Sequence, residues 1–114
     1  RLEFYRNYVR EFFKDYDLLL TPTLATPAFK VGEHPNVIGG QSVPDKLWGF
    51  TPFTYPFNMC GNPAATAPAG FSSDGLPIGL HLVGRWGDEE TVLAASKAFE
   101  DARPWADKKP AGFE

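Results

Sequence analysis

Residues 58–84 have the sequence NMCGNPAATAPAGFSSDGLPIGLHLVG, and this stretch decides the fold of the chain. It contains two apolar runs, residues 64–68 and 76–83, separated by a polar, glycine-containing turn at residues 70–75. In the second run every other residue from Ile78 to Leu82 is a large aliphatic one, which is the spacing of one face of a strand. The pattern therefore predicts two strands paired as an antiparallel hairpin.

The segments before the hairpin predict one helix and one further strand. Residues 1 to about 16 carry apolar side chains at helical spacing, namely Leu2, Tyr5, Val9, Phe12 and Phe13. Residues 18–23, LLLTPT, predict a short strand that Pro22 ends, because proline cannot donate a hydrogen bond to a sheet. Since its apolar residues are consecutive, we expect this strand to be buried on both faces.

The remaining segments predict a loop and two helices. Residues 25–44 are interrupted by glycine and proline and predict a loop, and the aromatic-rich residues 45–60 allow a short helix. A last helix is expected to begin near Asp88, where acidic residues suit a helix N-terminus, and to end at Pro104. Its expected buried stripe consists of Val92, Ala95, Phe99 and Ala102.

This order of elements favours an α/β fold with helices covering the strands. Three strands are few for a complete sheet, so the chain is expected to be part of a larger α/β sheet, with open strand edges and exposed apolar surface. Such edges favour association into homo-oligomers. The chain begins at Arg1 inside a helical pattern that lacks a capping residue, which predicts a piece of a longer polypeptide.

Composition excludes several classes of function. The 114 residues carry a net charge of -3 without clustered Lys and Arg, which argues against a nucleic-acid partner. No apolar run approaches the roughly 20 residues that a membrane-spanning helix needs. A single cysteine excludes an internal disulfide and favours a reducing, cytoplasmic location. Phosphate-binding and dinucleotide-binding glycine motifs are absent, and neither histidine has an acid at metal-ligand spacing, so no cofactor or metal is expected.

The order of short motifs along the chain resembles the C-terminal part of the amidase signature family. These motifs are DLLLTPT at 17–23, PFN at 56–58, Gly61, Pro63, PAG at 68–70, GLPIGL at 75–80, VG at 83–84 and the acidic helix start at Asp88. The resemblance implies that residues 1–114 are the C-terminal portion of an amidase domain, a fragment of its mixed-sheet fold. It also implies hydrolysis of a carboxylic amide to an acid and ammonia or an amine, without a cofactor.

The resemblance implies that no catalytic residue lies in this chain. Amidases of this family use a serine, a second serine and a lysine that precede the region resembled here, so the missing N-terminal part is the expected partner. Ser72 and Ser73 are better explained as a polar turn. Cys60 and His81 form a conceivable Cys–His pair, but a packed cysteine and a hydrogen-bonded sheet histidine are favoured. The alternative function is an independent binding or scaffold domain derived from the same fold.

The aromatic-rich segment is the candidate substrate-binding region. Its aromatic residues suit either core packing or the wall of an apolar pocket. The resemblance implies the pocket wall, with the substrate-binding residues Trp48, Thr51, Phe53, Thr54, Asn58 and Cys60. In the glutamine amidotransferases of the family, an acidic residue that grips the amino-acid substrate occupies the place of Thr51. Threonine there favours a neutral amide over glutamine. Asn58 is expected to hydrogen-bond loop backbone and hold the wall.

Overall fold

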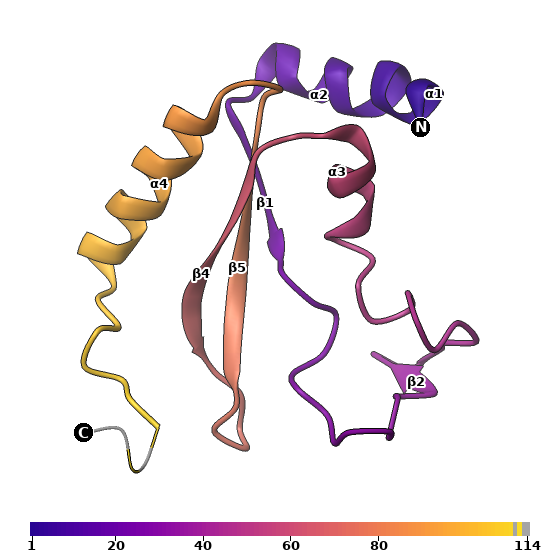
Figure 1. Cartoon of the computed structure of the whole chain (residues 1–114), viewed down its shortest axis with the longest axis vertical. Helices are drawn as coiled ribbons and strands as arrows, with labels where there is room; N and C mark the ends of the chain where they lie inside the picture. Colours follow the sequence, from indigo (N-terminus) through magenta and orange to yellow (C-terminus); the bar gives the residue numbers. More distant parts are fainter. Residues whose placement is uncertain (111, 113–114) are drawn as a thin grey trace.

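The central feature of the computed structural model is an antiparallel sheet of three strands (Figure 1), within a structure that describes residues 1–110 and 112. The strands are β1 (Leu18–Pro22), β4 (Ala64–Phe71) and β5 (Pro77–Gly84), in the order β1-β5-β4. His81 of β5 lies between Thr21 of β1 and Thr66 of β4 in the register. The α/β class and the predicted hairpin are confirmed. β4 is longer than the expected 64–68, and β5 lies one residue further along the chain than the expected 76–83.

The turn of the β4–β5 hairpin contains both serines. Gly75 takes a φ of +77°, which favours glycine, and the Ser72 hydroxyl accepts a hydrogen bond from the Leu76 backbone N–H at 3.1 Å. Ser72 therefore has the turn role that the sequence favours. A register shift between Pro68 and Gly70 adds a bulge to β4, as expected where proline cannot donate to a neighbouring strand.

The N-terminal helix lies across one end of the sheet. It consists of α1 (Leu2–Phe4), a π-helical segment η1 (Tyr5–Val9) and α2 (Arg10–Asp15), which follow one another without a break. Val9 and Phe13 are buried as expected, whereas Leu2 is exposed and falls outside the buried stripe. Arg85, after β5, fastens the end of α2, because its Nε donates to the Phe13 carbonyl at 3.0 Å and its guanidinium pairs with Asp17 at 2.9 Å.

Helices cover both faces of the hairpin. Val83 points to one face, where it packs with Val9, Phe13, Phe57 and Cys60. Leu82 points to the other face, where it packs with Ala67 and with Val92 of α4 (Glu89–Ala102). Asp88 caps α4 by accepting from the Thr91 N–H at 3.2 Å. Ala102, expected in the buried stripe of this helix, is exposed because it lies in the last turn.

The expected burial of β1 on both faces is wrong for Leu20. This residue stands opposite Leu82 in the register, on the face that α4 covers. α4 packs over β4 and β5 rather than over β1, so 55% of Leu20 remains exposed. The outer edge of β1 likewise has no neighbouring strand among the residues that the structure describes.

The long loop contains a small hairpin that was not predicted from the sequence. Its strands are β2 (Val37–Ile38) and β3 (Gln41–Ser42), joined by Gly39 and Gly40. Both glycines have positive φ, at +56° and +79°, as a two-residue hairpin turn requires. The Gly39–Gly40 pair is the sequence pattern that could have predicted this hairpin. The aromatic segment forms α3 (Tyr55–Cys60), which Gly61 ends in the left-handed conformation at φ +77°.

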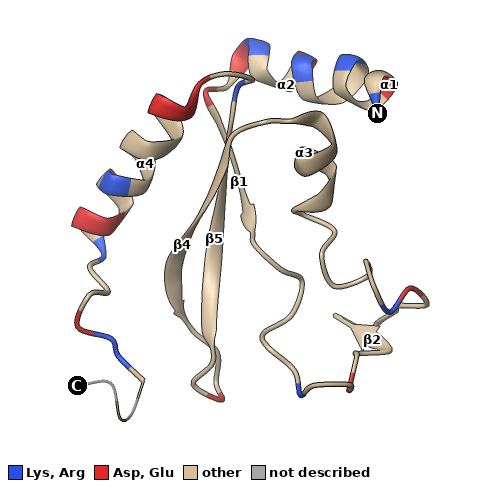
Figure 2. Cartoon of the chain, in the orientation of Figure 1, with Lys and Arg blue, Asp and Glu red and all other residues tan. Residues whose placement is uncertain are grey.

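Charged side chains are confined to the periphery. They lie on the N-terminal helix, on α4 and in loops, whereas β1, β4, β5 and α3 carry none (Figure 2). The sheet and α3 therefore form an uncharged centre. In the described residues we find no helix with the length and apolar character required to span a membrane.

Candidate functional site

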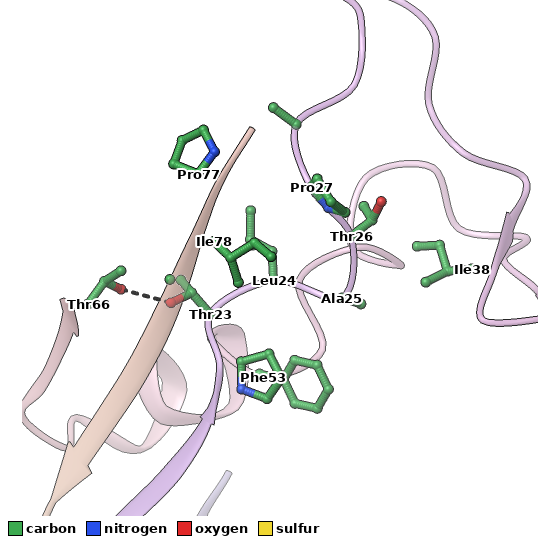
Figure 3. A pocket seen from close by; sticks show the side chains of 13 residues that line it. Thr23, Leu24, Ala25, Thr26, Pro27, Ile38, Phe53, Thr66, Pro77 and Ile78 are labelled. Carbon is green, nitrogen blue, oxygen red and sulfur yellow. Dashed lines mark hydrogen bonds between the residues drawn. The ribbon is translucent and has the colours of Figure 1, made fainter. Parts of the chain in front are cut away.

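A cavity of about 680 Å³ lies where the loop after β1 meets the start of β5 (Figure 3). Residues 22–28 form one side, and Ile38, Phe53, Thr66 and residues 77–79 form the rest. Every described residue that lines it is uncharged. Apolar walls with a few hydroxyl groups are the usual composition of a small-molecule pocket.

Two backbone hydrogen bonds hold the walls of this cavity together. The Thr23 N–H donates to the Gly79 carbonyl at 2.9 Å, which ties the loop to β5. The Ala25 N–H donates to the Phe50 carbonyl at 3.1 Å, which ties the same loop to the aromatic segment. Phe53 reaches the cavity for this reason, although it is far from the loop in sequence.

The predicted substrate-binding residues are not all brought together. Phe53 lines the cavity. Trp48 is 54% exposed and makes an edge contact with Tyr55, their ring centroids 6.1 Å apart. The hydroxyls of Thr51 and Thr54 donate to the backbone carbonyls of Trp48 and Thr51, at 3.0 and 3.3 Å. These two threonines thus stabilise the turns that lead into α3.

Asn58 and Cys60 lie on α3, away from the cavity. Asn58 is exposed, and its expected hydrogen bond to loop backbone is not found among the described residues. The nearby Asn62 does donate, from Nδ2 to the carbonyl of Gly84 at the end of β5, at 2.9 Å. Cys60 is buried in the core and borders a different cavity of about 710 Å³, beside Tyr5 and Trp86. Substrate binding by the six residues as a set stays a prediction.

Thr23 and Thr66 belong to the cavity and were missed from the sequence. Both line it, and their Oγ1 atoms lie 3.2 Å apart. A Cβ at Gly79 would come within 2.5 Å of Thr23 Oγ1, so this glycine leaves the space that the pair occupies. Gly79 within a strand pattern could have pointed to this pair, because a glycine inside a strand often marks a place where neighbouring groups approach closely.

His81 has the structural position favoured by the sequence. It is buried in β5, and its Nδ1 lies 3.2 Å from the Thr21 hydroxyl. Burial lowers the pKa of His81 by removing the charged form from water. A hydroxyl beside an imidazole is also how enzymes pair a nucleophile with a base. Thr21 does not line the cavity, so the contact is interpreted as structural.

The stability of the chain is expected to fall in mild acid because of His81. Since its folded-state pKa lies below the ordinary 6.5, the unfolded chain binds more protons as the pH falls through 6.5 toward the lowered value. The stability that neutral, buried His81 contributes is therefore fully present above pH 6.5 and is lost as the pH falls through this range. Urea unfolding at a series of pH values measures it. His81→Gln should flatten this dependence, whereas His34→Gln, at an exposed position, should leave it. Equal flattening by both variants would contradict the assignment.

No metal site is evident in the part of the chain that the structure describes, where no group of three His, Cys, Asp or Glu side chains is suitably placed.

Comparisons with known proteins relate this geometry to one family. The model of the family described as Amidase matches residues 1–93. An acylamidase from Rhodococcus erythropolis is 46% identical over 101 residues, which are 88% of this chain and 21% of that protein. A glutamyl-tRNA(Gln) amidotransferase subunit from Geobacter metallireducens is 45% identical over 97 residues, 85% of this chain and 19% of that protein.

Solved structures agree with the sequence comparisons. A bacterial aryl acylamidase belonging to the amidase signature enzymes has a TM-score of 0.74 at 41% identity, covering 85% of this chain and 20% of that one. A 6-aminohexanoate cyclic dimer hydrolase has a TM-score of 0.78 at 33% identity, covering 96% and 24%. The chain spans about a fifth of the length of the curated relatives it matches.

Proposed function

This chain belongs to the amidase signature family, and we propose that it is the C-terminal segment of an enzyme that hydrolyses an uncharged carboxylic amide to an acid and ammonia or an amine. Within that enzyme the segment supplies β1, β4 and β5 to the sheet. It also supplies one wall of the pocket for the acyl or aryl group, with Phe53 as the aromatic contact.

The observation that carries this proposal is the uncharged lining of the 680 Å³ cavity. Placing an ammonium or carboxylate there without a partner is costly, because the charge loses its hydration. Free glutamine carries both groups, so the lining disfavours it. Thr51 stands where a glutamine-binding relative is expected to have an acidic residue, which also disfavours glutamine as the substrate. The acylamidase and aryl acylamidase relatives support a neutral substrate as well.

The chemistry requires residues outside this chain. In the family mechanism a serine hydroxyl attacks the amide carbonyl, a second serine and a lysine relay its proton to the leaving amine, and water cleaves the acyl-enzyme. We assign that machinery to the remainder of the same polypeptide, which is the expected partner. The 114 residues alone are then inactive. A cytoplasmic, homo-oligomeric enzyme remains the expectation from the lone cysteine and the open strand edges.

The test is amide hydrolysis by the complete enzyme that contains this chain. We expect acetanilide and hexanamide to be hydrolysed in preference to glutamine. Phe53→Ala should lower kcat/KM for acetanilide about tenfold, because the phenyl group loses its apolar contact. Phe71→Ala is the matched control, since Phe71 is 56% exposed and does not line the cavity.

Two outcomes would contradict the proposal. Preference for glutamine over the neutral amides would exclude the assigned substrate class. Release of aniline from acetanilide by the 114-residue chain alone would place the chemistry in this segment.

A further inference from the structure

Two threonine hydroxyls form the polar end of the cavity that Phe53 lines. Thr23 follows β1 and Thr66 lies in β4, and β5 separates these two strands in the sheet. Their Oγ1 atoms nevertheless lie 3.2 Å apart, joined by the hydrogen bond drawn in Figure 3. The sheet therefore brings together two side chains that are 43 residues apart in sequence.

Gly79 makes this approach possible. A Cβ at this position would lie 2.5 Å from Thr23 Oγ1 and 2.7 Å from Thr66 Cγ2. Both distances are shorter than a nonbonded contact, so any larger residue would push the two threonines apart. Gly79, Thr23 and Thr66 all line the cavity, which places the hydroxyl pair where a ligand can reach it.

The pair can both donate and accept a hydrogen bond. A hydroxyl carries one hydrogen and two lone pairs, so when one threonine donates to the other, the second keeps its own hydrogen. The pair then offers one hydrogen and free lone pairs to a ligand in an otherwise apolar cavity. A hydroxyl group on a ligand can accept the hydrogen that the pair offers and donate its own hydrogen to a threonine lone pair. A carboxylate only accepts, and it brings a charge that no lining residue balances.

We infer that the Thr23–Thr66 pair binds an uncharged hydrogen-bonding substituent, such as a hydroxyl, on the apolar part of the amide substrate. This inference rests on the proposed function, because it takes the cavity as the pocket for the acyl or aryl group. A threonine pair across neighbouring strands also stabilises a sheet without any ligand. The test therefore needs a readout that a loss of stability does not move.

That readout is selectivity between amides that differ by one hydroxyl. The kcat/KM values for benzamide, 3-hydroxybenzamide and 4-hydroxybenzamide are compared in the complete enzyme that contains this chain, and circular dichroism establishes that each variant is folded. In the unmodified enzyme, kcat/KM for one hydroxybenzamide is expected to exceed that for benzamide about 3- to 10-fold, the effect of one hydrogen bond. Thr23→Val and Thr66→Val each should abolish the preference, so that the ratio of kcat/KM between the hydroxybenzamide and benzamide falls to about one.

Thr26→Val is the matched control, because Thr26 lines the same cavity but stands outside the pair. It should keep the preference. Equal kcat/KM values for all three amides in the unmodified enzyme, or a preference that survives in both valine variants, would overturn the inference without contradicting the proposed amide pocket. An equal loss of kcat/KM for all three amides in Thr66→Val would show that the pair is only a structural contact, and it would also overturn the inference. Failure of the complete enzyme to hydrolyse any of the three amides would overturn the proposed function as well.

Discussion

Phe57→Ala is expected to lower the free energy of unfolding of the chain by about 3–5 kcal/mol, the usual cost of deleting a buried aromatic side chain. Phe57 is 8% exposed and joins α3 to the core residues Val9, Phe13 and Val83. Its ring also lies 6.0 Å from the imidazole of His81, between ring centroids. The variant therefore removes contacts to the N-terminal helix and to β5 at once, and the free energy of urea unfolding measures the loss.

Phe71→Ala is the control for this prediction, because the same side chain is removed from a site that is 56% exposed. Its expected cost is within about 0.5 kcal/mol, as for most surface substitutions. Far-ultraviolet circular dichroism establishes that each variant is folded before unfolding is measured. Equal losses in the two variants would show that α3 does not pack on the sheet as described.

Gly84→Ala is expected to cost about 1–3 kcal/mol by overpacking the contact between β5 and α4. A Cβ at Gly84 would lie 2.5 Å from Val92 Cγ2 and 3.1 Å from the Asp88 carbonyl oxygen. The φ of Gly84 is not in the positive region that favours glycine, so backbone strain does not contribute. Crowding alone should produce the loss, which thermal and urea unfolding both measure.

A double-mutant cycle with Val92→Ala separates crowding from other causes. Val92→Ala removes the methyl group that the new Cβ would meet, so the double variant should lose less stability than the sum of the single losses. The expected difference is about 0.5–2 kcal/mol, the range for residues in contact. Strict additivity would show that the two positions do not touch and that α4 docks elsewhere.

The sequence by itself determined the local elements, because their signals come from neighbouring residues. Alternation in residues 76–83 predicted β5, and Asp88 marked the start of α4. The ordered motifs also indicated the amidase signature family, which the family model over residues 1–93 confirms. The Gly39–Gly40 hairpin was a local signal of the same kind that was overlooked.

Only the tertiary structure decided the cavity, because its walls come from segments that are distant in the chain. Leu20 is exposed since α4 lies over the other two strands, and no local pattern specifies where a helix docks. Asn62, just after the end of α3, donates to the carbonyl of Gly84 at the end of β5, which joins two segments 22 residues apart in the chain. Thr23 and Thr66 meet only because β5 carries Gly79 between them. Sequence spacing reports periodicity along one element, whereas a contact across three strands depends on their register and on the space left between their side chains.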